Sequence, residues 1–237
     1  MQEEGTPQGG RASPLLANIY LHYVFDLWVQ HWRKTKAKGD VIVVRWADDL
    51  VVGFEHQTDA EQFHQELAER FAKFKLKLHP EKTRVIEFGR WAAGNRKRRG
   101  QGQPETFNFL GFTHICGKKR SNGRFTVLRR TMSKRKRAKL KEIKLELGKR
   151  MHQPVPEVGK WLRSVVAGHN RYYGVPSHLQ SLSGFRFHVG RHWYRTLRRR
   201  SQKTRLTWER RRRLINLWLP RPTLHHPYPW RRLGVIT

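Results

Sequence analysis

The sequence predicts an α+β fold, in which a partial antiparallel sheet with helices is followed by an all-helical region. Two features indicate this. Up to about residue 131, short β-branched runs alternate with turn residues and amphipathic stretches. From Ser133 onward, apolar residues recur with the period of a helix, and basic residues fill the opposite side. We therefore place a domain boundary at Thr131, with expected domains of 1–131 and 132–237.

Two amphipathic helices are expected in the first domain. Ser13 and Pro14 provide an N-cap followed by a proline suited to the first turn, and apolar residues then recur at helical spacing as far as Trp32. Further along, Thr58 and Glu61 have the spacing of a capping box. A second helix should therefore begin near Thr58 and pack on the strands that precede it.

A β-hairpin is expected between these helices. The β-branched runs 41–45 and 50–54 are separated by only four residues, Trp-Ala-Asp-Asp. Such a short connection predicts a tight turn. Asp48 and Asp49 would then lie at its tip.

For the later part of the chain, the sequence predicts three strands and four helices. Residues 83–89 are expected to form a strand and the Gly- and Arg-rich stretch 90–105 an exposed connection. Residues 106–116 and 124–130 are expected to pair through an Asn-Gly turn of type I′. The helices of the second domain are expected at 133–150, 156–172, 179–200 and 207–218.

The charge of the chain points to a polyanionic partner. Lysine and arginine number 50 against 18 acidic residues, which gives a net charge of +32. Nucleic acid is favoured over a membrane surface, because the basic residues are interspersed with nine tryptophans on which bases could stack. No run approaches the length of a membrane span. The alternative is a merely soluble basic protein.

Cys116 is the only cysteine, so this chain can build neither a disulfide framework nor a cysteine-based zinc site. The N-terminal residues have no apolar stretch of the kind found in signal peptides. We expect a reducing, cytoplasmic location.

Two adjacent carboxylates on a hairpin turn are suited to holding a divalent metal ion. Hard Mg²⁺ prefers oxygen ligands and retains waters that substrate phosphates can replace. A bare Asp-Asp pair is more often a solvated turn. Here apolar strands precede and follow the turn, and the protein is strongly basic. Both features favour a functional role for Asp48 and Asp49 over a solvated turn.

Several motifs in order resemble the bacterial group II intron-encoded reverse transcriptase/maturase family. They are GTPQGGRASPLLANIYLHYVFD, RWADDLVVGF, FKLKLHPEKTRVIEFG, FNFLGFTHI, AGHNRYYGVPSHLQSL and LRRRSQKTRLTWERRRRLINLWLPRPTLHHPYP. The resemblance implies a partial palm over 1–131 and a helical thumb, or maturase (X) domain, over 132–237. It also implies RNA-directed DNA synthesis with Mg²⁺, for which Mn²⁺ can substitute, and with deoxynucleoside triphosphates as substrates. The implied partners are structured intron RNA and an RNA template with a DNA primer.

The resemblance also assigns site residues. Asp48 and Asp49 would be the catalytic metal carboxylates. Lys82 would lie near the incoming triphosphate, and the alternative is a solvated surface lysine. Trp46 stands where the family usually has tyrosine, and its ring could touch the primer end. The nucleotide and template pocket would be lined by Pro7, Gln8 and Gly9.

Arg45 has two alternative roles, a phosphate contact or a charge that supports the hairpin. The basic helices of the second domain are expected to track RNA phosphates, although any one of their residues is equally well explained as part of a solvated face. Most aromatic residues of these helices should be core. With Arg45, the expected RNA-binding residues are Lys134, Arg135, Lys136, Arg137, Arg198, Arg199, Arg200, Arg210, Arg211, Arg212 and Arg213.

Family members carry a fingers region and a further catalytic aspartate upstream of the PQG motif, and Met1 comes too late for either. Asp26, expected inside a helix, Asp40, at the outer end of a strand, and Asp59, in a first helical turn, do not replace that aspartate. Three interpretations follow: a split enzyme completed by a separate fingers/palm chain, a gene remnant, or a fragment retained for RNA binding. The functional alternative to polymerisation is a non-catalytic RNA-binding maturase or splicing chaperone.

Overall fold

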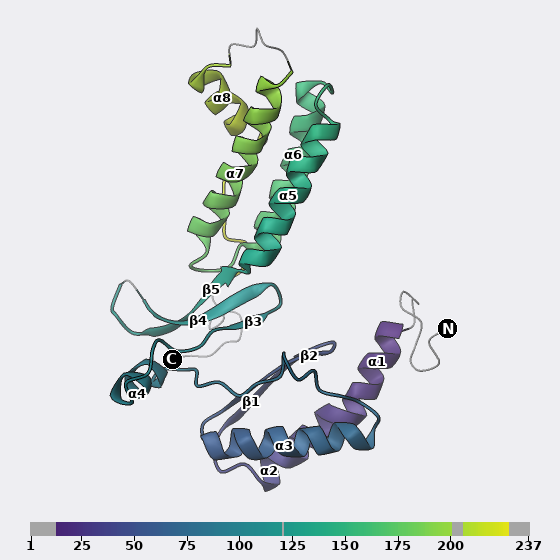
Figure 1. Ribbon diagram of the computed structural model, residues 1–237, viewed down its shortest axis with the longest axis vertical. Coiled ribbons are helices and arrows are strands. Elements are labelled where there is room, and N and C mark those ends of the chain that lie inside the picture. The colour runs from purple at the N-terminus through teal and green to yellow at the C-terminus, as the bar shows by residue number, and fades with distance from the viewer. Residues whose placement is uncertain (1–12, 120, 201–205, 228–237) are drawn as a thin grey trace. The chain divides into compact units, whose positions relative to one another are not determined.

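The computed structural model describes residues 13–119, 121–200 and 206–227. The chain forms two compact units, Met1–Glu87 and Phe88–Thr237, and each is described by itself (Figure 1). The sequence places a boundary at Thr131, whereas the two units divide after Glu87, so that the strands between Phe107 and Thr131 belong to the unit of the later helices. Thr131 itself is buried, and its backbone N–H donates to Nε2 of His178 at 2.9 Å.

The first described segment of the first unit is a nearly continuous helix. It consists of α1 (Ser13–Leu21), the π-helical turn η1 (His22–Asp26) and α2 (Leu27–Thr35). The expected amphipathic helix is thus confirmed, but the π turn was not expected. A π turn inserts an extra residue and rotates the following side chains relative to a regular helix. The buried residues of this segment are Val24, Phe25, Val29 and Trp32.

The predicted hairpin is confirmed as strands β1 (Val41–Trp46) and β2 (Asp49–Phe54). The strands pair antiparallel, from Val41 opposite Phe54 to Trp46 opposite Asp49. Side chains therefore alternate between an inner face that packs on the core and an outer face. The turn has two residues, and Ala47 at its first position has a φ of 53°, a left-handed conformation that costs a non-glycine residue energy.

Helix α3 (Gln57–Lys73) covers the inner face of the hairpin through Phe63, Leu67 and Phe71. The expected capping box is wrong, because the helix begins earlier and its N-cap residue makes no side-chain capping bond. Asp59, expected in the first turn of a helix, is buried and accepts the backbone N–H of Lys38 at 2.8 Å. It ties the loop before β1 to the helix.

The segment between the sheets departs from the prediction twice. The strand expected at 83–89 does not form, and no strand in the described part of the chain pairs with these residues. Within the expected connection lies a helix, α4 (Ala92–Arg98), built from alanines and long basic residues that favour helix. It ends in a Schellman motif: Gly100 has a φ of 67°, and Gln101 N–H bonds the Arg96 carbonyl at 2.8 Å.

The second sheet contains β3 (Phe107–Phe109), β4 (Phe112–Lys118) and β5 (Phe125–Thr131), all antiparallel. The expected strand at 106–116 is therefore two strands, separated by a turn in which Leu110 and Gly111 have φ values of 47° and 80°. The Asn-Gly connection before β5 is longer than the expected type I′ turn. The N–H of Gly123 in that connection bonds the carbonyl of Lys119.

The four predicted helices are confirmed as α5 (Ser133–Lys149), α6 (Val155–Tyr173), α7 (Leu179–Arg198) and α8 (Trp208–Trp218). Within this unit, α5, α6 and α7 lie side by side, with the sheet at one end and α8 near the other (Figure 1). Their core is built from Ile143, Leu147, Val158, Leu162, Val166, Phe185, Val189, Trp193, Leu197 and Leu219. None of the helices in the described ranges has both the length and the apolar character that crossing a membrane requires.

Helix α8 approaches the bundle where glycines leave room. A Cβ at Gly159 of α6 would lie 2.3 Å from the Trp218 ring. A Cβ at Gly168 of the same helix would meet nothing within 4 Å.

We predict opposite effects of alanine at these two glycines. Gly159→Ala should destabilise the protein by about 1–3 kcal/mol, because the indole of Trp218 must move out of a packed position. Gly168→Ala should stabilise it by about 0.5–1 kcal/mol through higher helix propensity. Urea denaturation of the two variants measures both changes, and equal effects would contradict the described packing of α8.

Candidate functional site

The tip of the first hairpin carries the two aspartates singled out in the sequence. Asp48 is the second residue of the turn, and Asp49 is the first residue of β2, directly opposite Trp46. Residues that pair across an antiparallel ladder point to the same face, so Asp49 and Trp46 share the outer face of the hairpin. Both aspartates are exposed, and Trp46 is 67% exposed. The tip therefore presents two carboxylates beside an aromatic ring.

Arg45 points to the other face and is held within the protein. Its Nε donates to Oδ1 of Asp26 at 2.8 Å, and its Nη2 donates to Oδ2 of the same carboxylate at 2.6 Å. Its Nη1 donates to Asn18 Oδ1 at 2.9 Å and to the carbonyl of Ala47 at 3.3 Å. Arg45 thus connects the first helix with the turn of the hairpin. Of the two roles expected for it, these contacts favour support of the hairpin over a phosphate contact.

The ion pair changes the acid–base behaviour of both partners. The hydrogen bond from Arg45 holds the pKa of Asp26 below its ordinary value, and the bond to Asp26 raises the pKa of Arg45. The two side chains are largely shielded, with exposed fractions of 26% for Asp26 and 16% for Arg45. A fork-shaped pair with this degree of burial has a more defined geometry than a surface ion pair.

The π turn η1 ends at Asp26, so the irregular segment sets the position of this carboxylate on the helix surface. The sequence assigned Asp26 only to a helix interior, and neither its role nor that of Asn18 was expected. A π turn leaves no clear periodicity signal, since it differs from the α-helix by one residue. The support of the hairpin tip could therefore not be found from spacing alone.

The donor set at the tip is compatible with a divalent metal ion that arrives together with phosphate. Asp48 and Asp49 supply hard carboxylate oxygens, and Mg²⁺ sites are often built from one or two carboxylates plus substrate phosphates and water. No group of three or more His, Cys, Asp or Glu side chains that could hold a metal occurs among the described residues. Among the described residues, the two aspartates are therefore the ligands that the protein offers to a metal ion at this tip.

The other expected nucleotide-binding residues are not assembled around the tip by any described contact. Lys82 is exposed and lies in a turn, where its N–H bonds the His79 carbonyl at 3.1 Å. Pro7, Gln8 and Gly9 lie outside the described residues.

The basic residues expected to bind RNA fall on the helices of the second unit. Lys134, Arg135 and Arg137 are exposed at the start of α5, and Lys136 is half-buried there. Arg198 and Arg199 are exposed at the end of α7, and three of the four arginines at 210–213 are exposed on α8. These exposed cations can reach a polyanion.

Arg200 and Arg211 have contacts inside the protein. Arg200 donates to the Gln153 carbonyl at 2.7 Å, so it also supports the fold. The guanidinium of Arg211 lies over two rings, with 4.9 Å to the centroid of Tyr194 and 5.0 Å to that of Trp208. The sequence grouped Arg211 with its neighbours on α8 and gave no sign of this position.

The aromatic residues of the helices are partly core, as expected. Trp193 is buried, and Trp161 and Trp218 pack against the core. Tyr172 and Trp208 are instead 51% and 65% exposed. Tyr172 lines a groove of about 430 Å³ between α5 and α6 whose basic side chains are Arg135, Lys136 and Lys139.

His225 and His226, which follow α8, bind protein groups. Nε2 of His225 lies 2.9 Å from Oγ1 of Thr223, and Nε2 of His226 lies 2.9 Å from the Arg171 carbonyl. The backbone N–H groups of both histidines also bond the Gly174 carbonyl. They fasten the segment after α8 to the end of α6.

Residues 1–114 match the family model described as reverse transcriptase (RNA-dependent DNA polymerase). The matched range contains the hairpin with Asp48 and Asp49, as well as Lys82 and the PQG motif. By this resemblance the enzymatic activity is that of an RNA-directed DNA polymerase, with a nucleic-acid template and primer as partners. A comparison with curated proteins finds no match to the chain.

We predict that Asp26→Asn lowers the free energy of unfolding of the first unit by about 1–3 kcal/mol at neutral pH, since it removes the charge that Arg45 binds through two hydrogen bonds. Urea denaturation followed by tryptophan fluorescence measures the change. Glu69→Gln, on the exposed side of α3, is the matched control and should change stability by less than about 0.5 kcal/mol.

The ion pair between Asp26 and Arg45 determines how this difference in unfolding free energy depends on pH. Because the pKa of Asp26 is lower in the folded state than its ordinary value of 3.8, its contribution is complete above that value and is lost as the pH falls through the lowered pKa. The stability difference between the wild-type protein and Asp26→Asn should therefore be constant near neutrality and vanish in acid. A difference that persisted unchanged below the lowered pKa would show that the ion pair is not its source.

Proposed function

We propose that this chain is the palm and thumb portion of a reverse transcriptase of the group II intron type, which copies an RNA template from a DNA primer and assists the splicing of its intron RNA. The single observation that carries the proposal is the hairpin tip within the matched segment, where Asp48 ends the two-residue turn and Asp49 begins β2. The assignment to group II introns, and the thumb, or maturase, role of residues 132–237, rest on the motifs of the sequence.

In this proposal the chain's own residues position the reacting groups. Asp48 and Asp49 would hold Mg²⁺, which supplies activation of the primer 3′-hydroxyl and stabilisation of the leaving pyrophosphate when bound. Trp46, on the same face as Asp49, offers its ring to the primer terminus. Arg45 fixes the turn from the opposite face. Lys82 contributes a point charge for the triphosphate, and Pro7, Gln8 and Gly9 line the template pocket.

The outer face of the hairpin supports the proposal that a further fingers/palm portion completes the site. Ile42 is 68% exposed and Val44 is 46% exposed on this face, beside Trp46. A two-stranded sheet with an apolar face open to water is marginally stable without a cover. A complementary fingers/palm half would bury this face and contribute further ligands to the metal site.

The alternative is a non-catalytic RNA-binding maturase or splicing chaperone. It is favoured by the net charge of +32 and by the exposed basic residues of α5, α7 and α8. This function needs no carboxylates at the hairpin tip. Removing the two aspartates therefore separates the two functions.

The test is primer extension on an RNA template with Mg²⁺ and deoxynucleoside triphosphates, performed with the chain alone and with an added fingers/palm half. Changing both Asp48→Asn and Asp49→Asn should lower the extension rate about 100-fold or more, because metal ligation contributes several kcal/mol to the barrier. Asp40→Asn, an exposed aspartate at the other end of the same hairpin, is the control and should leave extension unchanged.

RNA affinity should be unchanged or slightly higher in the double variant, since removing negative charge cannot weaken attraction to phosphate. Extension that survives the double substitution would exclude the polymerase mechanism at this tip. Tight RNA binding without extension under any condition would favour the maturase or chaperone alternative.

A further inference from the structure

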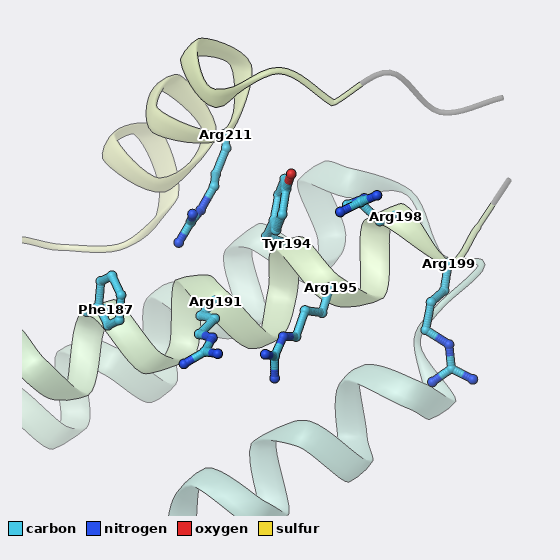
Figure 2. Close-up of a pocket in the computed structure, with 7 residues that line it drawn as sticks. All are labelled: Phe187, Arg191, Tyr194, Arg195, Arg198, Arg199 and Arg211. Atoms are coloured by element: carbon cyan, nitrogen blue, oxygen red, sulfur yellow. The ribbon is translucent and has the colours of Figure 1, made fainter. Parts of the chain in front are cut away.

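Helices α7 and α8 form an arginine-lined groove of about 590 Å³. Side chains at positions 187, 191, 195 and 198 follow one another at helical spacing along one side of α7, and α8 closes the groove from its other side (Figure 2). We define the arginine groove by Phe187, Arg191, Tyr194, Arg195, Arg198 and Arg211.

The cations of the arginine groove lack a neighbouring carboxylate among the residues that the structure describes. None of Arg191, Arg195, Arg198 and Arg211 is within ion-pairing distance of a carboxylate in the part of the chain that the structure describes. Like charges gathered in one hollow repel one another and destabilise the fold unless an anion binds. The groove is therefore suited to phosphate groups.

Aromatic rings hold two of these arginines in place. Tyr194 lies between them, with its ring centroid 4.9 Å from the guanidinium carbon of Arg211 and 5.9 Å from that of Arg198. The Nε of Arg211 is buried and has no hydrogen-bond partner in the structure. A guanidinium held against a ring loses less freedom when it binds a phosphate than one that is free in solvent.

Phe187 differs from Tyr194 in its exposure. Its side chain is 55% exposed at the end of the arginine row (Figure 2). A large exposed ring next to phosphate-binding groups is the arrangement with which proteins bind single-stranded nucleic acid, where an unpaired base stacks on the ring. The bases of a duplex stack on one another and cannot use such a ring in the same way.

We propose that the arginine groove binds a single-stranded segment of polynucleotide, with its phosphates on Arg191, Arg195, Arg198 and Arg211 and one base stacked on Phe187. This inference rests on the proposed function only in taking the chain to bind nucleic acid. It adds a second site, on the helical unit, that needs neither the hairpin tip nor a base-paired ligand.

The test measures binding of the full chain to a labelled oligouridylate single strand and to an RNA duplex of equal length, over a range of salt concentrations. Phe187→Leu keeps an apolar side chain but removes the ring. It should weaken single-strand binding at least about fivefold, with an unchanged salt slope and unchanged duplex binding. Phe187→Trp, which keeps an aromatic ring, should bind the single strand about as tightly as the wild-type protein.

Arg191→Gln with Arg195→Gln should reduce the slope of log affinity against log salt by about 0.7 for each lost phosphate contact on a single strand. The matched control is Lys141→Gln with Lys144→Gln, which removes the same charge from exposed positions of α5. This control should change the slope for the oligouridylate less than the arginine pair does.

Single-strand binding that is unaffected by Phe187→Leu would overturn the inference while leaving polymerase activity at the hairpin intact. Displacement of the strand by inorganic polyphosphate, with no effect of Phe187→Leu, would identify a site for polyanions in general and also overturn it. Failure of the chain to bind any nucleic acid would instead refute the proposed function.

Discussion

The ion pair between Arg45 and Asp26 is the contact on which the candidate site depends most directly. It connects the last inner-face residue of β1 with the π turn of the first helix, and the same guanidinium reaches the Ala47 carbonyl in the hairpin turn. Ala47 has a left-handed backbone that the surrounding structure must maintain. The pair thus fixes the conformation of the two-residue turn that presents Asp48 and Asp49.

The hairpin register then decides what each face can do. One face buries Val43 and Val52 against the helices, and the other carries Asp49 and Trp46 into solvent. Negative charge is therefore concentrated on an exposed tip of a chain whose net charge is +32. In the second unit the charge is positive, with exposed arginines on α7 and α8. In the proposed polymerase, the carboxylates of one unit would hold metal and the cations of the other would bind phosphate, and these two requirements complement each other.

Much of this organisation could be predicted from the sequence, and the failures have physical reasons. The hairpin and the helices α5–α8 were predicted because their hydrophobic periods are strong. Residues 106–116 were predicted to form a single strand, because a leucine at position 110 does not indicate the left-handed turn that separates β3 from β4. The strand predicted at 83–89 does not form, because residues of high β propensity need a neighbouring strand to pair with. At the site, Asp48 and Asp49 were expected, whereas the Arg45 contact and the arginine groove depend on tertiary placement that spacing does not encode.

The central claim, that Asp48 and Asp49 hold a divalent metal ion, is tested most directly by iron-mediated cleavage of the polypeptide. With Fe²⁺ in place of Mg²⁺ on the template–primer complex, followed by ascorbate and peroxide, hydroxyl radicals cut the backbone next to the bound metal. We predict cuts at residues 46–50 that disappear when both aspartates are changed to asparagine. Cuts elsewhere, or cuts at the tip that survive the double change, would contradict the account.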